Sequence, residues 1–351
     1  MAAICHNYLP PEWAPQYGVM LTWPHEHGDW DDGLPAVETC FVQMASNIAR
    51  FEDVVIAAHD KAHEQHIIDQ LAAAGTRMDR VHSFIAASND IWARDHGPLT
   101  VLCSNEAKLL DYSFNGWGGK YQHDLDNTLS RKLSQQHAFG NNPMETIDWV
   151  LEAGSIEVDG SGTLLTTESC LLNRNRNPEL SHEQLETILK QQLGLTRILW
   201  LHHGQLQGDD TDGHIDTIAR YCDRNTIAYV RCNDPRDPHY TSFKDMEAEL
   251  KQLVGAEGKP YRLVALPWPK PVYSDEGKRL PATYANFLII NGAVLVPLYN
   301  DAADERALEI LAGCFPDREI IGINSLPLIK QYGSIHCASM QLPSQIMSQS
   351  R

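Results

Sequence analysis

Near the C-terminus the chain reads Gly333-Ser334-Ile335-His336-Cys337-Ala338. A glycine followed by β-forming residues predicts the start of a strand that carries the Cys337 thiol on one face. A free cysteine usually packs as a small buried hydrophobe, and this is the simplest interpretation of Cys337. The alternative is a nucleophile on which other polar groups converge. The organisation of the rest of the chain distinguishes the two.

The order strand, strand, helix, strand is predicted four times between residues 97 and 323. Hydrophobic alternation indicates the strands, and apolar residues at helical spacing indicate the helices. The predicted copies are 97–112, 125–138 and 147–151; 154–172, 182–193 and 197–201; 214–231, 241–254 and 261–266; and 286–298, 302–313 and 319–323.

A fifth copy results if the two ends of the chain are joined. The strand at Cys337 would pair with a strand at 18–23, followed by a helix at 35–50 and a strand at 53–58. A repeat that closes on itself is typical of modules arranged around an axis. We therefore expect an α/β fold of five ββαβ modules in a single domain, residues 1–351, closed by the N- and C-terminal segments. An open α/β sheet is the alternative.

Composition and charge restrict the class of partner. The 351 residues are 43% hydrophobic and 21% charged, with a formal net charge of −18. Nucleic acid and anionic membranes need a basic surface, so neither is expected as a partner, whereas a small cation fits. With no apolar run of about 18 residues and no basic leader before an apolar segment, the expected location is cytoplasmic. Whether the chain forms a homo-oligomer stays open.

The cysteines give no sign of a metal or redox motif. There are eight, at positions 5, 40, 103, 170, 222, 232, 314 and 337, and no two form a C-x-x-C pair. Reduced thiols are therefore expected rather than disulfides, and a zinc-finger type of site is not indicated.

Polar clusters precede the first strand of several predicted modules. Asp95 stands before the pair at 97–112, Glu152 before 154–172, His214 and Asp216 before 214–231, and Cys337 before the fifth pair. In a ring these groups would meet at one end of the axis. Each also has a simpler interpretation: Asp95 could pair with its neighbour Arg94, Glu152 could be solvated, and His214 and Asp216 could bind a metal.

A metal site would use the aspartate-rich run from Asp209 to Asp216, which includes His214. Oxygen ligands of this kind suit a divalent cation, although neither zinc-like nor EF-hand spacing is present. A planar guanidinium is the other candidate ligand, because a carboxylate can accept two parallel hydrogen bonds from its N–H groups. With Asp95 and Asp216 holding that group, its central carbon would face the sulfur of Cys337. No cofactor or metal is then needed.

Several motifs resemble those of the agmatine deiminase family, within the guanidino-group-modifying superfamily that includes bacterial peptidylarginine deiminases. They span nearly the whole chain in family order and are specific as a set. They are Trp92-Ala-Arg94-Asp95-His-Gly-Pro98, Phe114-Asn-Gly-Trp117-Gly-Gly-Lys120-Tyr121, Leu151-Glu152-Ala-Gly154-Ser-Ile, residues 162–168 with Asn175-Arg176-Asn-Pro178, Gly213-His214-Ile-Asp216, and Gly333-Ser-Ile-His-Cys337.

The resemblance implies a pentein-type propeller of five ββαβ modules, with the active site on the pseudo-fivefold axis. It also implies that Cys337 attacks the guanidinium carbon and that His214 protonates the departing ammonia. His214 then activates the water that hydrolyses an amidino-cysteine intermediate. The residues implied to hold the substrate are Asp95, Asp216 and Glu152 around the guanidinium, with Trp92 and Trp117 as pocket walls and cation–π partners.

The implied reaction converts agmatine to N-carbamoylputrescine and ammonia, a step of polyamine metabolism toward putrescine, without a cofactor. Free arginine and peptidyl-arginine are alternative substrates. Arginine would need a cation for its carboxylate, and Arg176 is a candidate, although bracing its own loop is the favoured role. Ala153 and Ser334 depart from the family pattern, so the reaction is better supported than the substrate. A third hypothesis is a protein that binds polyamines or guanidines without catalysing a reaction.

Overall fold

The strands of residues 6–347, the part of the chain that this computed structural model describes, form five small sheets. In each, two antiparallel strands are followed by a helix and a third strand parallel to the second. Four sheets contain β5 (Leu99–Cys103), β6 (Glu106–Ser113), α5 (Asp126–Gln135) and β7 (Met144–Val150); β8 (Ile156–Val158), β9 (Thr163–Thr167), α7 (His182–Leu193) and β10 (Arg197–Leu201); β11 (Ala219–Asp223), β12 (Thr226–Val230), α8 (Tyr240–Leu250) and β13 (Arg262–Leu266); and β14 (Leu288–Ile290), β15 (Ala293–Leu298), α9 (Asp304–Cys314) and β16 (Glu319–Asn324).

The fifth sheet joins the two ends of the chain, as expected. β17 (Ser339–Pro343) pairs antiparallel with β2 (Gln16–Thr22), which pairs in parallel with β3 (Asp53–Ala58) after α1 (Leu34–Ile48). The helix and the strand that the sequence predicts at about 61–74 and at 81–85 are α2 (Lys61–Ala73) and β4 (Val81–Ile85), and β4 extends this sheet. One addition was not expected: β1 (Asn7–Tyr8) adds to the edge of β5.

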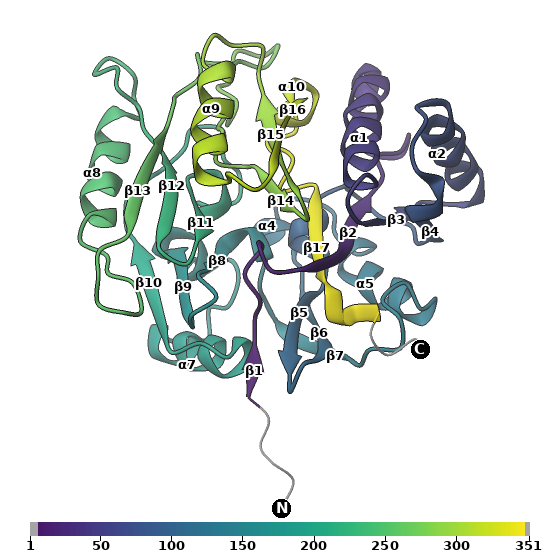
Figure 1. Ribbon diagram of the computed structural model, residues 1–351, viewed down its shortest axis with the longest axis horizontal. Helices are drawn as coiled ribbons and strands as arrows, with labels where there is room; N and C mark the ends of the chain where they lie inside the picture. Colours follow the sequence, from purple (N-terminus) through teal and green to yellow (C-terminus); the bar gives the residue numbers. More distant parts are fainter. Residues whose placement is uncertain (1–5, 348–351) are drawn as a thin grey trace, which may run out of the picture.

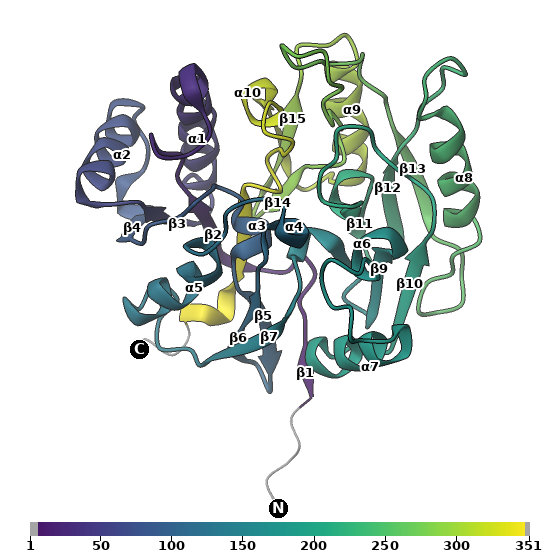
Figure 2. The same ribbon diagram turned by 180° about the vertical axis from the view of Figure 1, so that it is seen from behind.

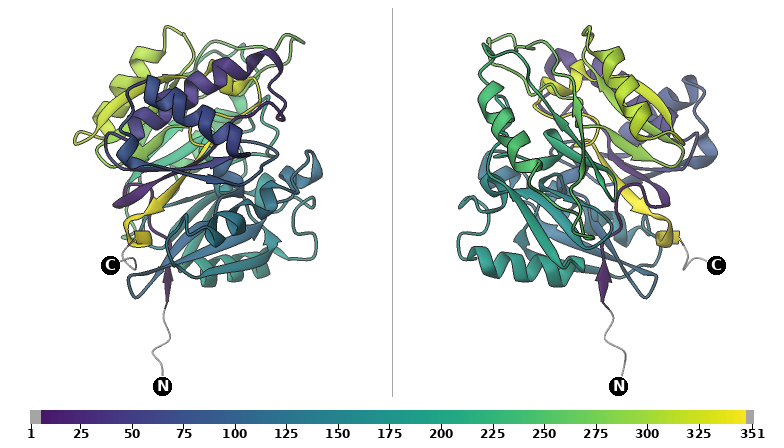
Figure 3. Two further views of the ribbon diagram at one scale, coloured as in Figure 1. Left: turned by 90° about the vertical axis from the view of Figure 1, so that its right-hand side faces the viewer. Right: turned by 60° about the vertical axis from the view of Figure 1, so that its left-hand side comes forward.

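The longer helices, α1, α2, α5, α7, α8 and α9, lie at the periphery and the strands lie inside (Figures 1 and 2). The further views in Figure 3 place α1 and α2 together on one side of the molecule and α7 on the opposite side. The buried face of a peripheral helix is apolar, as in α7, which buries Leu185, Leu189 and Leu193, spaced four residues apart. No helix between residues 6 and 347 has the length and apolar character required to cross a bilayer.

Three predicted strand segments are wrong, and all three lie next to the polar clusters. Residues 168–171 form a helical turn, α6 (Glu168–Leu171), and Asp216 lies in the 3₁₀ turn η4 (Ile215–Thr217) rather than on a strand. Cys337 lies in a turn closed by the Ala338 N–H, which donates to the Ser334 carbonyl oxygen at 3.1 Å. Local hydrogen bonds of this kind compete with sheet pairing, and residue pattern alone does not reveal them.

The expectation that all the thiols are reduced is also wrong, because Cys103 is disulfide-bonded. Scattered cysteines without a C-x-x-C pair do not indicate which thiols the fold brings together. Cys5 lies outside the described residues. Free thiols among the described residues are Cys40, Cys170, Cys222, Cys232, Cys314 and Cys337.

Candidate active site

The predicted site residues come from short turns, each directly before the first strand of a sheet. Asp95 is in α3 (Ala93–His96) before β5, and Glu152 precedes η3 (Ala153–Ser155) before β8. His214 precedes η4 before β11, and Cys337 lies two residues before β17. Because these turns occupy equivalent places in four sheets, residues far apart in sequence meet at one location.

A pocket leads to Cys337. Four predicted site residues line it, and all are at most 6% exposed: Trp92, Asp95, Trp117 and Cys337. Further lining residues are Asp90, Tyr121, Asp210, Thr211, Thr217, Gln331, Tyr332 and Gly333. Gly333 has to be small, because a Cβ there would lie 2.2 Å from the Trp92 ring. The pocket is therefore narrow, with aromatic walls and acidic groups.

Asn286 and Asp216 surround the Cys337 thiol. Asn286 Nδ2 lies 3.2 Å from Cys337 Sγ, and Asn286 Oδ1 accepts from the Cys337 backbone N–H at 3.3 Å. Asp216 Oδ2 lies 3.7 Å from the sulfur. Burial, followed by the charges of Asp216 and Asp95, raises the pKa of the Cys337 thiol well above its ordinary value. The empty site therefore holds a protonated thiol, and a bound cation would favour the thiolate.

Asp95 is held at the closed end of the pocket by two neutral donors. Trp117 Nε1 donates to its Oδ2 at 3.0 Å, and the Gly154 N–H donates to Oδ1 at 3.2 Å. Trp117 has a φ of 54°, an uncommon conformation for a bulky residue, which places its indole over this carboxylate. Burial raises the pKa of Asp95 to about 6. Its charge is therefore present at neutral pH and is lost in mild acid.

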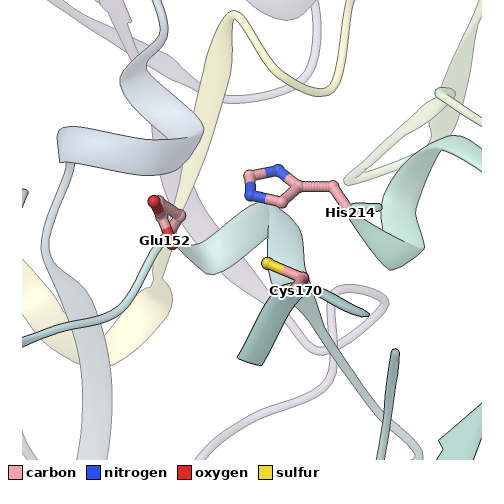
Figure 4. A group of neighbouring side chains, drawn as sticks. All are labelled: Glu152, Cys170 and His214. Atoms are coloured by element: carbon pink, nitrogen blue, oxygen red, sulfur yellow. The ribbon is translucent and has the colours of Figure 1, made fainter. Parts of the chain in front are cut away.

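His214 is fully buried beside Asp95, Glu152 and Cys170. Figure 4 shows the side chains of Glu152 and Cys170 beside its ring, and one potential ligand atom of each of the three residues lies within 4.8 Å of the others. His214 Nδ1 lies 3.6 Å from Asp95 Oδ1, and neither ring nitrogen has a hydrogen-bond partner among the described residues. Burial lowers its pKa, but Asp95, followed by Cys170 and Glu152, raises it well above its ordinary value. The imidazole is therefore protonated and can act as an acid.

Glu152 faces an arginine rather than the pocket. Arg176 Nε lies 2.9 and 3.1 Å from the two Glu152 oxygens, and Arg176 Nη1 contacts Asp212 at 2.7 Å. Both side chains of the Glu152–Arg176 pair are fully buried. The favoured expectation for Arg176 is confirmed: it braces its loop and the base of the site.

Gly154 allows the acidic groups and the imidazole to converge. A Cβ at this position would lie 2.6 Å from His214 Nδ1, 2.8 Å from Asp95 Oδ1 and 3.2 Å from Asp216 Oδ2. Asp216 is fully buried, and its Oδ1 has no hydrogen-bond partner among residues 6–347. An unpaired buried carboxylate oxygen is costly, so it is suited to a ligand that brings its own donors.

The aspartate run does not converge on a common point where a metal could bind. Asp209 accepts from the backbone N–H groups of Thr211 and Gly213. Asp212 is bound by Arg176, Asn175 and Lys120, and Asp210 accepts from the Tyr121 hydroxyl at 2.7 Å. These carboxylates accept hydrogen bonds that stabilise their own loop. This argues against a metal-dependent hydrolase that would use the run from Asp209 to Asp216.

Two other buried clusters have potential ligand atoms within 4.8 Å of one another. They are Glu152, Cys170 and His214, and Glu12, Glu157 and His336. Each has an arginine paired with its carboxylates: Arg176 binds Glu152, and Arg220 binds Glu12 and Glu157. Since a guanidinium already balances the negative charge, a divalent cation would meet repulsion there. Ion-pair networks describe both clusters better than metal centres.

The structure brings all seven predicted site residues to one place, but not all into the pocket. Trp92, Asp95, Trp117 and Cys337 line it, whereas His214, Asp216 and Glu152 are buried behind the lining. Sequence reasoning missed Asn286, which precedes β14 in the place where the other four sheets carry their polar turn. The same positional rule, applied to the fourth sheet, could have found it. Asp90 and Asp210, which belong to the polar clusters before β5 and β11, form the acidic outer lining, although the sequence suggested only a metal-binding role for Asp210.

Comparison with known proteins agrees with the motifs. A family model described as Porphyromonas-type peptidyl-arginine deiminase matches residues 8–343. Agmatine deiminase from Pseudomonas syringae pv. syringae is 34% identical, covering 96% of this chain and 95% of the relative. A solved Porphyromonas gingivalis protein, provisionally described as an arginine deiminase, is 48% identical with a TM-score of 0.90, covering 97% of this chain and 99% of that one. C. jejuni agmatine deiminase, solved as a cysteine-to-serine variant with substrate bound, is 37% identical with a TM-score of 0.89, covering 97% and 98%. The chain belongs to the Porphyromonas-type peptidyl-arginine deiminase family.

Proposed function

We propose that the protein hydrolyses agmatine to N-carbamoylputrescine and ammonia, a step of polyamine metabolism toward putrescine. Relatives named agmatine deiminase cover nearly the whole chain. The observation that carries the proposal is the convergence of a thiol, two carboxylates and an imidazole at the closed end of one pocket. Gly154 lies within contact distance of three of these groups, His214, Asp95 and Asp216. A planar cation is the ligand that two buried carboxylates beside a thiol favour.

The reaction would begin with the guanidinium held by Asp95 and by the free Oδ1 of Asp216, its carbon facing Cys337 Sγ. The positive charge of the substrate favours loss of the thiol proton to solvent. The thiolate attacks the guanidinium carbon, and His214 gives its proton to the departing nitrogen, which leaves as ammonia. An amidino-cysteine intermediate remains.

Neutral His214 then takes a proton from water, and the resulting hydroxide attacks the carbon of the intermediate. The carbon–sulfur bond breaks, the hydroxyl proton of the adduct passes to the departing sulfur, and the products are the Cys337 thiol and a neutral urea group. Glu152 would stabilise the imidazolium form of His214, which it faces at the base of the site. This geometry favours a role on His214 over direct contact with the guanidinium.

The outer pocket favours agmatine over arginine. Asp90 and Asp210 line it, and Tyr121 donates its hydroxyl hydrogen to Asp210 at 2.7 Å. Burial raises the pKa of Asp90 to about 7, and an approaching ammonium would favour its ionised form. The substrate carboxylate of arginine would meet these acidic groups. Arg176 is fully buried in its pair with Glu152 and does not line the pocket.

We also propose how the five sheets are arranged around the pocket. The five sheets would be the five ββαβ modules of a pentein-type propeller in a single domain, with the pocket on its pseudo-fivefold axis. The equivalent positions of the polar turns before β5, β8, β11, β14 and β17 support this arrangement. The proposed location is cytoplasmic, which the free thiols favour although Cys103 is paired.

The test is ammonia release from agmatine, arginine and a blocked peptidyl-arginine, measured side by side. Cys337→Ala should abolish release, and Cys314→Ala, at a half-buried thiol that does not line the pocket, should leave it unchanged. Turnover of agmatine alone is expected. Turnover of arginine or the peptide instead would overturn the substrate, and activity that survives in Cys337→Ala would overturn the covalent mechanism.

A further inference from the structure

His336 lies between two buried carboxylates, one in the active site and one from the N-terminal segment. Its Nδ1 lies 2.7 Å from Asp216 Oδ2, and its Nε2 lies 2.7 Å from Glu12 Oε2. All three side chains are at most 7% exposed. Since carboxylate oxygens accept, both ring nitrogens of His336 are donors in this geometry.

Glu12 is itself firmly held. Its Oε1 accepts from the Ile289 N–H at 2.6 Å, and its Oε2 accepts from Arg220 Nη2 at 2.7 Å. Arg94 Nη2 approaches the same oxygen at 3.9 Å. The charged and titratable groups around His336 are Asp216, Glu12, Glu157, Arg94, Arg220 and Cys337. The position of the imidazole is thus fixed from the side opposite the pocket.

We propose that His336, held by Glu12, is the positioning residue that keeps Asp216 ionised and aimed at the substrate. One Asp216 oxygen is tied to His336, and the other is left without a partner, as a guanidinium ligand requires. The same hydrogen bond fixes the carboxylate relative to Cys337, whose sulfur lies 3.7 Å from the tied oxygen.

Asp95 provides an internal comparison, because it is the other carboxylate assigned to the guanidinium and is equally buried. Its hydrogen bonds come from neutral donors, an indole and a backbone amide, whereas the protonated His214 ring lies 3.6 Å away, beyond hydrogen-bond distance. Burial raises the pKa of Asp95 to about 6. For Asp216 burial acts in the same direction, but the hydrogen bond and charge of His336 outweigh it and hold the pKa below its ordinary value. Without the imidazole, Asp216 should titrate in the range of Asp95.

The test is the pH profile of kcat/KM for agmatine in the His336→Asn variant. Asparagine keeps a neutral donor near the Nδ1 position but carries no charge. In the unmodified protein Asp216 stays ionised through this range, so the raised pKa values of Asp95 and Asp90 set the acid side of the kcat/KM profile. In the variant Asp216 titrates as well, so the fall should steepen by about a further tenfold per pH unit, and its midpoint should rise by about 0.4 unit.

Two further variants distinguish a specific effect on Asp216 from a general loss of structure. Glu12→Gln removes the acceptor charge behind His336 and should shift the acid side in the same direction by a smaller amount. His239→Asn is the matched control, because His239 is also buried and lies 2.7 Å from a carboxylate, Asp237, that does not line the pocket. It should leave the shape of the profile unchanged.

An unchanged profile in His336→Asn, or an equal loss at every pH, would overturn the proposal. The inference about His336 rests on the proposed function only because its test measures turnover of agmatine. If the unmodified protein releases no ammonia from agmatine, the proposed function fails separately. In that case the role of His336 is tested by calorimetry: binding of agmatine is measured over the same pH range in the variant and in the unmodified protein. Guanidinium ion replaces agmatine if agmatine does not bind. Binding that weakens no more steeply toward acid in the variant than in the unmodified protein would reject the inference.

Discussion

Both polar atoms of the Asn286 side chain contact Cys337. Nδ2 lies 3.2 Å from the Cys337 sulfur, and Oδ1 lies 3.3 Å from the Cys337 backbone nitrogen. The same Oδ1 also accepts from the His336 N–H at 3.0 Å. One side chain, from the turn before β14, thus fixes the turn before β17. The two turns are about 50 residues apart in the chain and belong to different sheets.

Asn286→Ala should therefore reduce kcat by about two orders of magnitude, because misplacing a nucleophile by about 1 Å costs this much. Steady-state ammonia release measures the effect. Asn291→Ala is the control: Asn291 follows β14 and binds the backbone of Gln16 instead. It should lower thermal stability and leave kcat unchanged. Similar kcat losses in the two variants would contradict a specific role for Asn286.

Gly154→Ala should abolish activity, because the added methyl carbon would lie 2.6 Å from His214 Nδ1 and 2.8 Å from Asp95 Oδ1. Gly313→Ala makes the same chemical change inside α9, where nothing lies within 4 Å. It should keep full activity and stabilise the protein by about 0.5–1 kcal/mol, since alanine is the better helix former. Thermal unfolding and ammonia release compare the two. An active Gly154→Ala variant would show that the site is looser than the structure indicates.

The pH dependence of kcat/KM should show the raised pKa of Asp95. This carboxyl is protonated as the pH falls through about 6, and a neutral Asp95 cannot hold the guanidinium by charge. The rate should therefore decline below about pH 6, whereas an ordinary aspartate would hold it to about pH 4. Initial rates from pH 5 to 9 measure this. A rate that stays flat down to pH 5 would mean that Asp95 does not contact the cation.

Asp210→Asn should raise KM for agmatine about tenfold or more while kcat changes little, because the proposed contact is to the ammonium end and not to the reacting carbon. Butylguanidine, which lacks the amine, is the matched substrate. Its kcat/KM should be the same in the variant and the unmodified protein. Equal losses with both substrates would assign Asp210 to loop structure, through its hydrogen bond with Tyr121.

Arg176→Met should destabilise the protein by about 3–5 kcal/mol, because it leaves the Glu152 carboxylate buried without its partner. Thermal or urea unfolding measures the loss. Combining Arg176→Met with Glu152→Gln should recover part of that stability, since the buried charge is then removed. A pocket role for Arg176 predicts something different: Arg176→Met would selectively weaken the use of arginine while stability stayed unchanged.

The sequence by itself determined the order of elements and most of their bounds. The helix that apolar spacing predicts at 182–193 matches α7 to the residue. Its bounds are encoded locally, since Ser181 and Gln184 form a capping box at its start and Gly194, at a φ of 70°, ends it. The strands at 53–58, 81–85 and 197–201 also match their predicted ranges, as hydrophobic runs bounded by turn residues. The polar turns before β5, β8, β11 and β17 then indicated where the site lies.

Only the tertiary structure decided which groups in those turns act on one another. Glu152 pairs with Arg176 and not with the pocket, and Asp216 is tied through His336 to Glu12, 204 positions earlier in the chain. Such contacts depend on burial, which makes an unpaired charge costly and so selects partners by proximity in space. Residue pattern reflects local backbone preference. It does not show which distant charges the packing of five sheets brings within hydrogen-bond distance.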